Sequence, residues 1–191
     1  MEVKKSALKE AVKQVYLSNL TGEKVEEEIK LKLKSEGLIN DEGELTEKGR
    51  SLIKVVLAGG VFDIIHPGHV YFLKKSKELG DVLVVVVARD ENVKKFKGVE
   101  PMHNESMRLE LVSSIKYVDA AILGDKNDLM VTVEKVKPDI VALGYDQVHD
   151  EAWIKEEAKK RGIKLEVVRL DSPYPNIKSR NIKRDPRFGT L

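Results

Sequence analysis

The chain of 191 residues lacks cysteine, has few aromatic residues and contains no long apolar run. The absence of cysteine excludes disulfides, thiolate nucleophiles and zinc–thiolate sites. The longest apolar stretch, VLVVVVA at 82–88, is much shorter than the roughly 20 residues that a membrane-spanning helix needs. The N-terminal MEVKKSALKEAVKQVY mixes charged with apolar residues and lacks the apolar core of a secretory leader. We therefore expect a cytoplasmic protein with no membrane segment.

An excess of charge of one sign is also missing. The 34 Lys and Arg residues nearly balance the 32 Asp and Glu residues, and the net charge is +2. No overall field therefore recruits nucleic acid or a membrane surface, and any anion-binding site must be local. The length and the hydrophobic content of 41% suffice for one full core plus a small additional part.

Residues 1–52 predict a small helical module. Apolar residues recur at three- and four-residue steps in two stretches, namely Leu8, Ala11, Val12 and Val15, then Val25, Ile29 and Leu33. Thr21 is expected to N-cap the second helix. A glycine stop, a turn around 41–43, a short strand-like piece and a helix start at Thr46 follow. This order resembles a fragment of a winged-helix module.

The module could bind DNA, or it could pack on the rest of the chain or make a dimer contact. Residues 1–50 contain ten basic and eleven acidic residues, a net charge of −1. Binding to DNA needs a basic face, whereas the second helix begins with EKVEEE and would place carboxylates against phosphates. The composition therefore favours packing or association.

From residue 53 the pattern changes to alternating strands and helices. Short β-branched apolar runs predict strands at 53–58, 81–88, 118–123, 139–144 and 163–170. Helices are expected at 69–78, 104–116, 127–136 and 150–161, the last ending at Gly162. Continuous apolar runs indicate strands buried on both faces, as in a parallel sheet. Residues 53–191 therefore predict an α/β domain with a doubly wound parallel sheet of the Rossmann-like type.

The segment GGVFDIIHPGH at 59–69 follows the first predicted strand, where such sheets bind ligands. Gly59 and Gly60 allow a phosphate to approach the backbone, and the helix starting near His69 offers free N–H groups to an anion. His66 and His69 lie on one turn with Gly68 between them, so both can donate hydrogen bonds to an oxyanion. A zinc pair is the alternative, but the spacing lacks further ligands, so no metal site is predicted.

The longer segment GGVFDIIHPGHVYFLKKSKELGD resembles the His-x-Gly-His motif of the nucleotidyltransferase superfamily. That superfamily includes cytidylyltransferases, pantetheine-phosphate adenylyltransferase and archaeal FAD synthases, and the resemblance covers residues 53 to about 184. It implies that a substrate phosphate attacks the α-phosphorus of a nucleoside triphosphate and expels pyrophosphate, with Mg²⁺ offsetting phosphate charge. His66 and His69 would bind the phosphates and stabilise charge in the transition state.

The resemblance also implies roles for residues outside the motif. Lys97, with Lys95 as the second choice, would reach the substrate phosphate, and Arg108 would open a helix beneath the site. Each could instead be an ordinary surface or capping residue. The implied nucleotide-binding set is Gly59, Gly60, Val61, Phe62, Asp63, His66, Gly68, His69, Gly144, Asp146, Gln147, Lys178 and Ser179.

The C-terminal segment matches the superfamily only loosely. Its second signature is represented by NIKSRNIKR, where Lys178 and Ser179 can stand near the triphosphate. The tail carries a basic cluster that suits phosphate or is simply a solvated end: Lys178, Arg180, Lys183, Arg184 and Arg187.

The segments VDAAILGDKND and VEKVKPDIVALGYDQ look most like archaeal FAD synthases, which transfer AMP from ATP to FMN. A CTP-dependent enzyme acting on a small phosphoalcohol such as glycerol 3-phosphate is the alternative, and a non-catalytic nucleotide sensor is the alternative of another class. Both His103 and His149 are expected to be exposed to solvent. Aromatic cover for an isoalloxazine is available from Phe62, Tyr71, Phe96, Tyr145 and Tyr174, which could equally pack in the core. A homodimer is expected, and a nucleic-acid partner is not.

Overall fold

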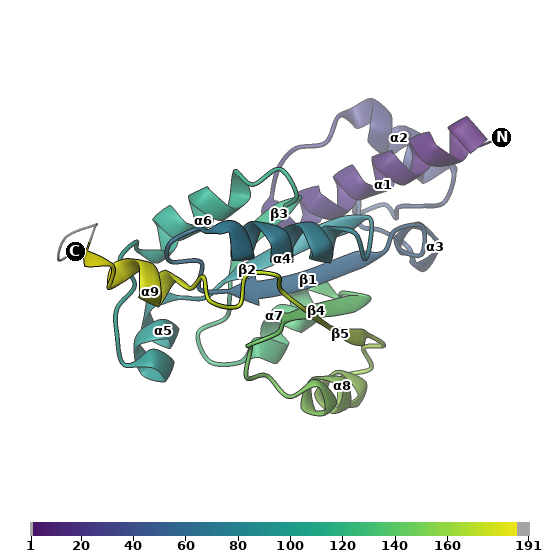
Figure 1. The fold of residues 1–191 in the computed structure, drawn as a ribbon. Helices are drawn as coiled ribbons and strands as arrows, with labels where there is room; N and C mark the ends of the chain where they lie inside the picture. Colours follow the sequence, from purple (N-terminus) through teal and green to yellow (C-terminus); the bar gives the residue numbers. More distant parts are fainter. Residues whose placement is uncertain (1, 187–191) are drawn as a thin grey trace.

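A five-stranded sheet with helices on both faces organises the chain (Figure 1), in a computed structural model that describes residues 2–186. The strands lie in the order β3-β2-β1-β4-β5, and every pairing is parallel. Their bounds are Val55–Gly60 (β1), Val82–Val87 (β2), Ala120–Leu123 (β3), Ile140–Gly144 (β4) and Glu166–Leu170 (β5). The predicted doubly wound parallel sheet is confirmed, with each strand within three residues of its expected start.

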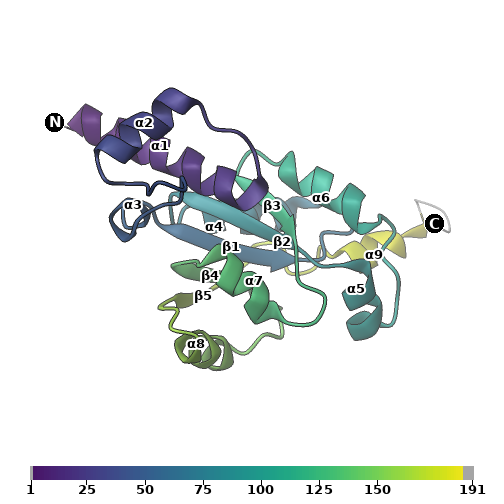
Figure 2. The ribbon, with the colours of Figure 1, turned by 180° about the vertical axis from the view of Figure 1, so that it is seen from behind.

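The helices divide between the two faces of this sheet. Their bounds are Glu2–Thr21 (α1), Glu27–Ser35 (α2), Glu47–Arg50 (α3), Pro67–Lys77 (α4), Asp90–Lys97 (α5), Glu105–Ser113 (α6), Leu129–Val136 (α7), Glu151–Lys160 (α8) and Ser179–Lys183 (α9). Because successive strand side chains point to opposite faces, Val55 and Leu57 join a core with α1, α2, α7 and α8. The alternate residues Val56 and Ala58 join a second core with α4 and α6. Figure 2 views the molecule from the side opposite to that of Figure 1 and shows the first of these two faces.

Helix ends follow the expected local chemistry in most places. Asn104, Asp128 and Asp150 each accept a backbone hydrogen bond at the start of α6, α7 and α8. The chain turns after α8 at Gly162, whose φ of 70° lies in the left-handed region, as predicted. Helix α5 was not expected from the sequence.

Helices α1 and α2 pack on the face of the sheet that α7 and α8 also cover. Val12, Val15 and Leu33 belong to the same buried cluster as Val82 and Val84 of β2. This packing is the favoured alternative for the module. The expected strand-like piece is reduced to a single antiparallel bridge between residues 39 and 45.

The predicted N-cap at Thr21 is wrong. Thr21 is the last residue of α1, and its hydroxyl donates to the Leu17 carbonyl at 2.9 Å. Helix α2 begins later, after Glu26, whose side chain makes no capping bond. A hydroxyl that can bond back to the preceding turn is satisfied at a helix end, so its position alone did not fix which helix it served. Thr46 does cap α3, where it accepts from the Gly49 amide at 3.1 Å.

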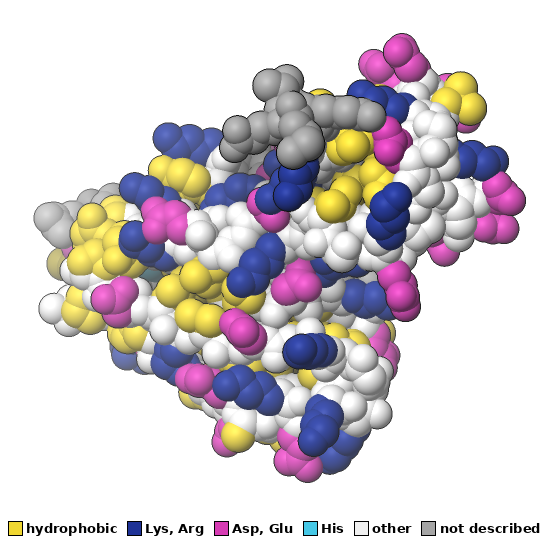
Figure 3. All heavy atoms as spheres, turned by 90° about the vertical axis from the view of Figure 1, so that its right-hand side faces the viewer, with side chains coloured by type: hydrophobic (Ala, Val, Ile, Leu, Met, Phe, Trp, Pro, Cys, Tyr) yellow, Lys and Arg dark blue, Asp and Glu magenta, His cyan; other side chains and the backbone are white. Residues whose placement is uncertain are grey.

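Basic and acidic side chains alternate over the face that carries the N-terminal module (Figure 3). This view shows no broad basic patch. Within residues 2–186, no helix has the length and apolar character needed to cross a membrane.

Candidate active site

The predicted site residues converge where β1 and β4 end. The chain leaves β1 towards β2 on one side, whereas β4 and β5 lie on the other, which makes this the point where ligands bind in doubly wound sheets. Gln147 spans the two strands: its side-chain amide donates to the Gly59 carbonyl at 2.7 Å and accepts from the Gly144 amide at 3.2 Å. Gln147 therefore holds the two strand ends at a fixed separation.

His66 and His69 form a stacked pair at the start of α4. Their ring centroids lie 3.8 Å apart with an interplanar angle of 26°. His66 occupies the N-cap position with extended backbone and makes no capping bond, and Pro67 opens the helix. A Cβ on Gly68 would stand 3.1 Å from the His66 ring. The glycine therefore keeps the space in which the His66 ring lies against His69.

Both imidazoles have unsatisfied hydrogen-bonding capacity. The two Nδ1 atoms are buried and have no hydrogen-bond partner within the described part of the chain. Burial lowers the pKa of His69 to about 4, and the charges of His66 and Lys97 lower it further. A hydrogen bond to the Ile64 backbone and the charge of Asp146 act in the opposite direction. Burial also lowers the pKa of His66, against the opposing charge of Asp146. Burial therefore favours the neutral form of both rings, in which each imidazole carries one N–H and one unprotonated nitrogen.

Phe62 supports this pair from within the core. It is buried, has a positive φ of 53° and places its ring centroid 5.2 Å from that of His69. A Cβ on Gly60 would stand 3.0 Å from the Phe62 ring, so that glycine accommodates the ring. A positive φ at a bulky residue costs of order 1–3 kcal/mol and persists only where its surroundings hold it. The structure thus places Phe62 under the imidazoles as packing.

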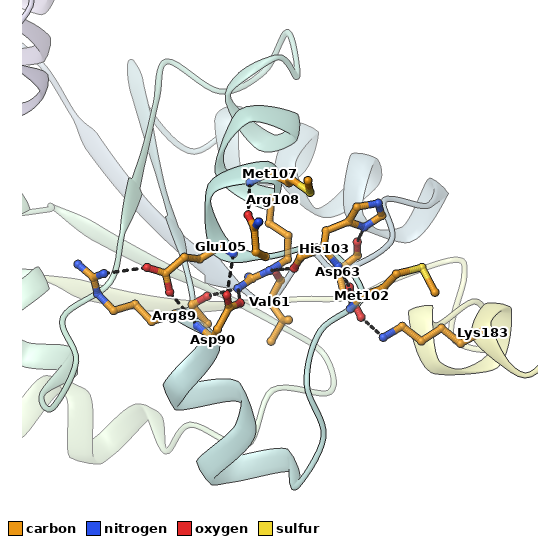
Figure 4. Close-up of polar contacts among 12 residues, drawn as sticks. Val61, Asp63, Arg89, Asp90, Met102, His103, Glu105, Met107, Arg108 and Lys183 are labelled. Carbon is orange, nitrogen blue, oxygen red and sulfur yellow. Dashed lines mark hydrogen bonds and ion pairs between the residues drawn. The ribbon is translucent and has the colours of Figure 1, made fainter. Parts of the chain in front are cut away.

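Arg108 lies beneath the site, fully buried with a side-chain exposure of 0%, and all of its nitrogens are engaged (Figure 4). The guanidinium donates to three backbone carbonyls, those of His103 at 2.9 Å, Val61 at 2.6 Å and Ala88 at 2.7 Å. It also pairs with Asp90 at 2.7 Å. Arg108 therefore joins the β1–α4 loop to the end of β2 and has no donor directed at solvent.

Asp63 is likewise turned inward. Its carboxylate accepts from the backbone amides of Met102 at 2.7 Å and His103 at 3.2 Å and forms an ion pair with Lys183 of α9 (Figure 4). Burial alone would raise the pKa of Asp63, but the Lys183 and backbone hydrogen bonds together hold it below the usual value. Asp63 therefore fastens three segments to one another.

The two remaining histidines differ in exposure. The expectation of a solvent-exposed His103 is wrong, because its ring is partly buried and its Nδ1 lies 2.8 Å from the Asp63 carbonyl. His149 is exposed as predicted. The sequence offered no signal for the first contact, since its partners lie 40 residues apart.

The C-terminal segment closes the site on the β4 side. Lys178 pairs with Asp146 at 2.8 Å, and its ammonium lies 5.5 Å from the Tyr145 ring centroid. The Ser179 hydroxyl donates to the Ile64 carbonyl at 3.0 Å. These predicted residues are therefore brought to the β1–α4 loop, whereas Arg187 lies outside the described residues.

Lys97 comes from α5, a different element from the pair. It ends α5, is exposed to solvent and has no ion-pair partner among residues 2–186. Its charge acts on His69, which places it within electrostatic reach of the imidazoles. Lys95 lies beside the Phe96 ring instead.

A hollow of about 580 Å³ opens next to His66, and sequence reasoning did not identify it. The residues that line it are Ile65, His66, Pro67, Val70, Tyr71, Lys74 and Tyr174. The Tyr71 and Tyr174 rings meet edge to face at 6.2 Å and 81°. The sequence signals only that Tyr71 and Tyr174 are aromatic. It does not show that they meet, because the segment that carries Tyr174 contacts α4 only in the folded chain.

No group of three or more potential metal-ligating side chains occurs in the part of the chain that the structure describes. A magnesium ion held mainly by nucleotide phosphates does not need one, since Mg²⁺ in such sites uses one or two carboxylates at most.

Comparison with known proteins agrees with this geometry. The chain is 56% identical over 118 residues to a FAD synthase of Ferroglobus placidus, an alignment that covers 62% of this chain and 76% of the relative. It is 58% identical over 115 residues to a FAD synthase of Aciduliprofundum boonei, with 60% and 76% covered. A crystal structure described as a lipopolysaccharide core biosynthesis protein from Thermoplasma volcanium matches with a TM-score of 0.61 and 51% identity, covering 63% of this chain and 98% of that one.

The model of one protein family covers the whole region built above. It is described as cytidylyltransferase-like and matches residues 57–185, from the middle of β1 to just beyond α9. Helices α1 to α3 lie outside this match. On this match the chain belongs to the cytidylyltransferase-like family.

Proposed function

We propose that the protein is an FMN adenylyltransferase, which transfers AMP from ATP to FMN and releases pyrophosphate. The stacked His66–His69 pair at the N-terminus of α4, with neutral rings and unsatisfied nitrogens, carries the proposal for the chemistry. The choice of ATP and FMN is supported by relatives named FAD synthase at 44–58% identity.

The reaction needs positioning and charge stabilisation rather than a protein nucleophile. A phosphate oxygen of FMN attacks the α-phosphorus of ATP, a new P–O bond forms, and the bond to the pyrophosphate leaving group breaks. His66 and His69 donate hydrogen bonds to the phosphate oxygens as charge develops there. Lys97, unpaired and exposed, binds the phosphate of FMN. Lys178 leaves Asp146 for the triphosphate, which frees the Asp146 carboxylate for the ribose hydroxyls.

Several predicted residues act on this chemistry indirectly. Arg108 and Asp63 hold the β1–α4 loop through their buried contacts, and we assign them as positioning residues rather than catalytic ones. Gly59 and Gly144 let the nucleotide approach the backbone at the strand ends, whereas Gly60 accommodates the Phe62 ring. Mg²⁺, when bound with ATP, would be held mainly by the phosphates and would neutralise their charge.

The test is pyrophosphate release with Mg²⁺, crossing ATP and CTP against FMN, glycerol 3-phosphate and phosphopantetheine. Release with ATP and FMN alone is the expected result. Release with CTP would retain the mechanism and replace the substrates, whereas no release in any combination would favour a nucleotide sensor. His69→Asn serves as the blank, because it removes an imidazole N–H from the phosphates while retaining a polar side chain.

Two further properties remain predictions for this protein: a homodimer and a cytoplasmic location. Sedimentation equilibrium of the purified chain measures the first, and fractionation of cells that express it measures the second.

A further inference from the structure

The loop that joins β4 to α8 is held by the guanidinium of one arginine. Nη1 of Arg169 donates to the Gly144 carbonyl at 2.9 Å and to the Gln147 carbonyl at 2.8 Å. Nη2 donates to the His149 carbonyl at 2.9 Å, and Nε donates to the Glu151 carboxylate at 2.7 Å. Since Gly144 ends β4 and Glu151 begins α8, these contacts span the loop from one end to the other.

Strand β5 directs Arg169 towards this loop. Side chains two residues apart in a strand share a face of the sheet, and Val167 joins the core that α7 and α8 cover. Arg169 therefore points to the face on which α8 packs against β5 (Figure 1). Its neighbour in the strand register is Leu143, just before the end of β4. The side chain of Arg169 is 31% exposed, so it lies at the surface rather than in the core.

Two other side chains of the loop meet the C-terminal segment. The Tyr145 hydroxyl donates to the Pro175 carbonyl at 2.9 Å, and Asp146 pairs with Lys178 at 2.8 Å. In the proposed reaction Lys178 moves to the triphosphate, so Asp146 loses its ion-pair partner at the moment when its carboxylate is needed at the ribose. The four contacts of Arg169 do not involve Lys178 and survive that movement.

We propose that Arg169 is a positioning residue, which holds the loop so that Asp146 stays at the nucleotide ribose after Lys178 has left it. The inference rests on the proposed function, because it assigns Asp146 to the nucleotide. Arginine suits this task, since its planar guanidinium offers five donors in a fixed geometry, whereas a lysine ammonium offers three donors at one point. Here the guanidinium serves four separate acceptors.

Arg169→Met tests the proposal with the full chain. Titration calorimetry with α,β-methylene-ATP, which cannot react, should show a dissociation constant raised about tenfold, because the hydrogen bond from the ribose to a charged group is lost. The KM for ATP should rise by the same factor. Both kcat and the KM for FMN should change less than about twofold, since a contact made equally in the ground and transition states affects binding alone. Arg169→Lys should recover only part of the affinity.

Arg161→Met is the matched control. The side chain of Arg161 has a similar exposure of 28%, and its ion-pair partners are Asp128, Glu134 and Glu157. These partners lie outside the loop, so the variant removes the same charge without releasing it. Its affinity for the ATP analogue should match that of the wild type. Equal weakening in both arginine variants would overturn the inference, because the loss of positive charge alone would then explain the result.

A double-mutant cycle separates positioning of Asp146 from general loosening of the protein. Asp146→Asn should weaken binding of the ATP analogue in the wild type, and the factor should be at least about threefold smaller in the Arg169→Met background, where the carboxylate is already misplaced. Lys97→Met should raise the KM for FMN by the same factor in both backgrounds, because Lys97 lies on α5. Independent effects of Arg169 and Asp146 would contradict the positioning role.

The outcomes distinguish the inference from the proposed function. If the wild type forms no FAD but binds the ATP analogue, and Arg169→Met weakens that binding, the proposed function fails and the positioning role stands. If the wild type forms FAD and Arg169→Met binds the analogue with unchanged affinity, the function stands and the positioning role fails. A wild type that neither forms FAD nor binds the analogue would overturn both.

Discussion

Stability of this protein should fall between pH 7 and pH 5 because of His69. Its pKa is about 4 in the folded chain and about 6.5 in an unfolded one. Between these values the unfolded chain binds a proton that the folded chain excludes, so stability decreases as the pH falls. The stabilisation is fully present above about pH 6.5 and is lost towards pH 4. From pH 7 to pH 5, linkage gives a loss of about 2 kcal/mol from this residue.

Urea denaturation at pH 7, 6 and 5 in wild type and His69→Asn measures this term. The variant removes the titrating ring, so its free energy of unfolding should change by about 2 kcal/mol less over the interval than that of the wild type. His66 remains and contributes a smaller slope of the same sign. The lowered pKa of Asp63 acts below about pH 4, outside this range. Equal slopes in the two proteins would refute the claim that burial keeps His69 neutral.

Three substitutions test the surroundings of the pair. Arg108→Lys cannot make the four buried contacts of the guanidinium and should cost about 3–5 kcal/mol in urea unfolding; a stability loss below about 1 kcal/mol would show that these contacts matter little. Gly68→Ala should push the His66 ring from its place and lower kcat by up to about 100-fold. The Tm should be unchanged or higher, since alanine favours the helix. An unchanged kcat would mean that the ring tolerates the methyl group. Lys97→Met should raise the KM for FMN at least about tenfold through loss of a charged phosphate contact, whereas the matched Lys95→Met should not, and equal effects of the two would contradict the assignment.

The fold could be predicted because its strands are continuous apolar runs that fit only a sheet buried on both faces. Helix α5 escaped prediction because its sequence DENVKKFK carries only two apolar residues, too few to show a period. Helix α9 buries no residue at all and is held by polar contacts such as that of Ser179 with Ile64, which are 115 residues apart. No local pattern contains such information.

The site divides in the same way. His66, Gly68 and His69 are neighbours in sequence, so their geometry follows from one helix start and could be predicted. The positions of Arg108 and Asp63 were also indicated, but the direction in which their side chains point was not. Whether a charged group faces a ligand or the core depends on which carbonyls and amides surround it, and Arg108 meets Val61 from 47 residues away.

The N-terminal helices have a consequence for the synthesis of the protein. Strand β2 is a run of six buried Val and Leu residues, the kind of segment that associates with other chains when it emerges uncovered. A ribosome makes α1 and α2 before β2, and domains form from the N-terminus onward. The apolar residues Val12, Val15 and Leu33, which finally share a buried cluster with this strand, are thus already outside the exit tunnel when it appears. Helices α1 and α2 are thus synthesised before β2, the segment most prone to aggregate, and are available to bury it as it emerges.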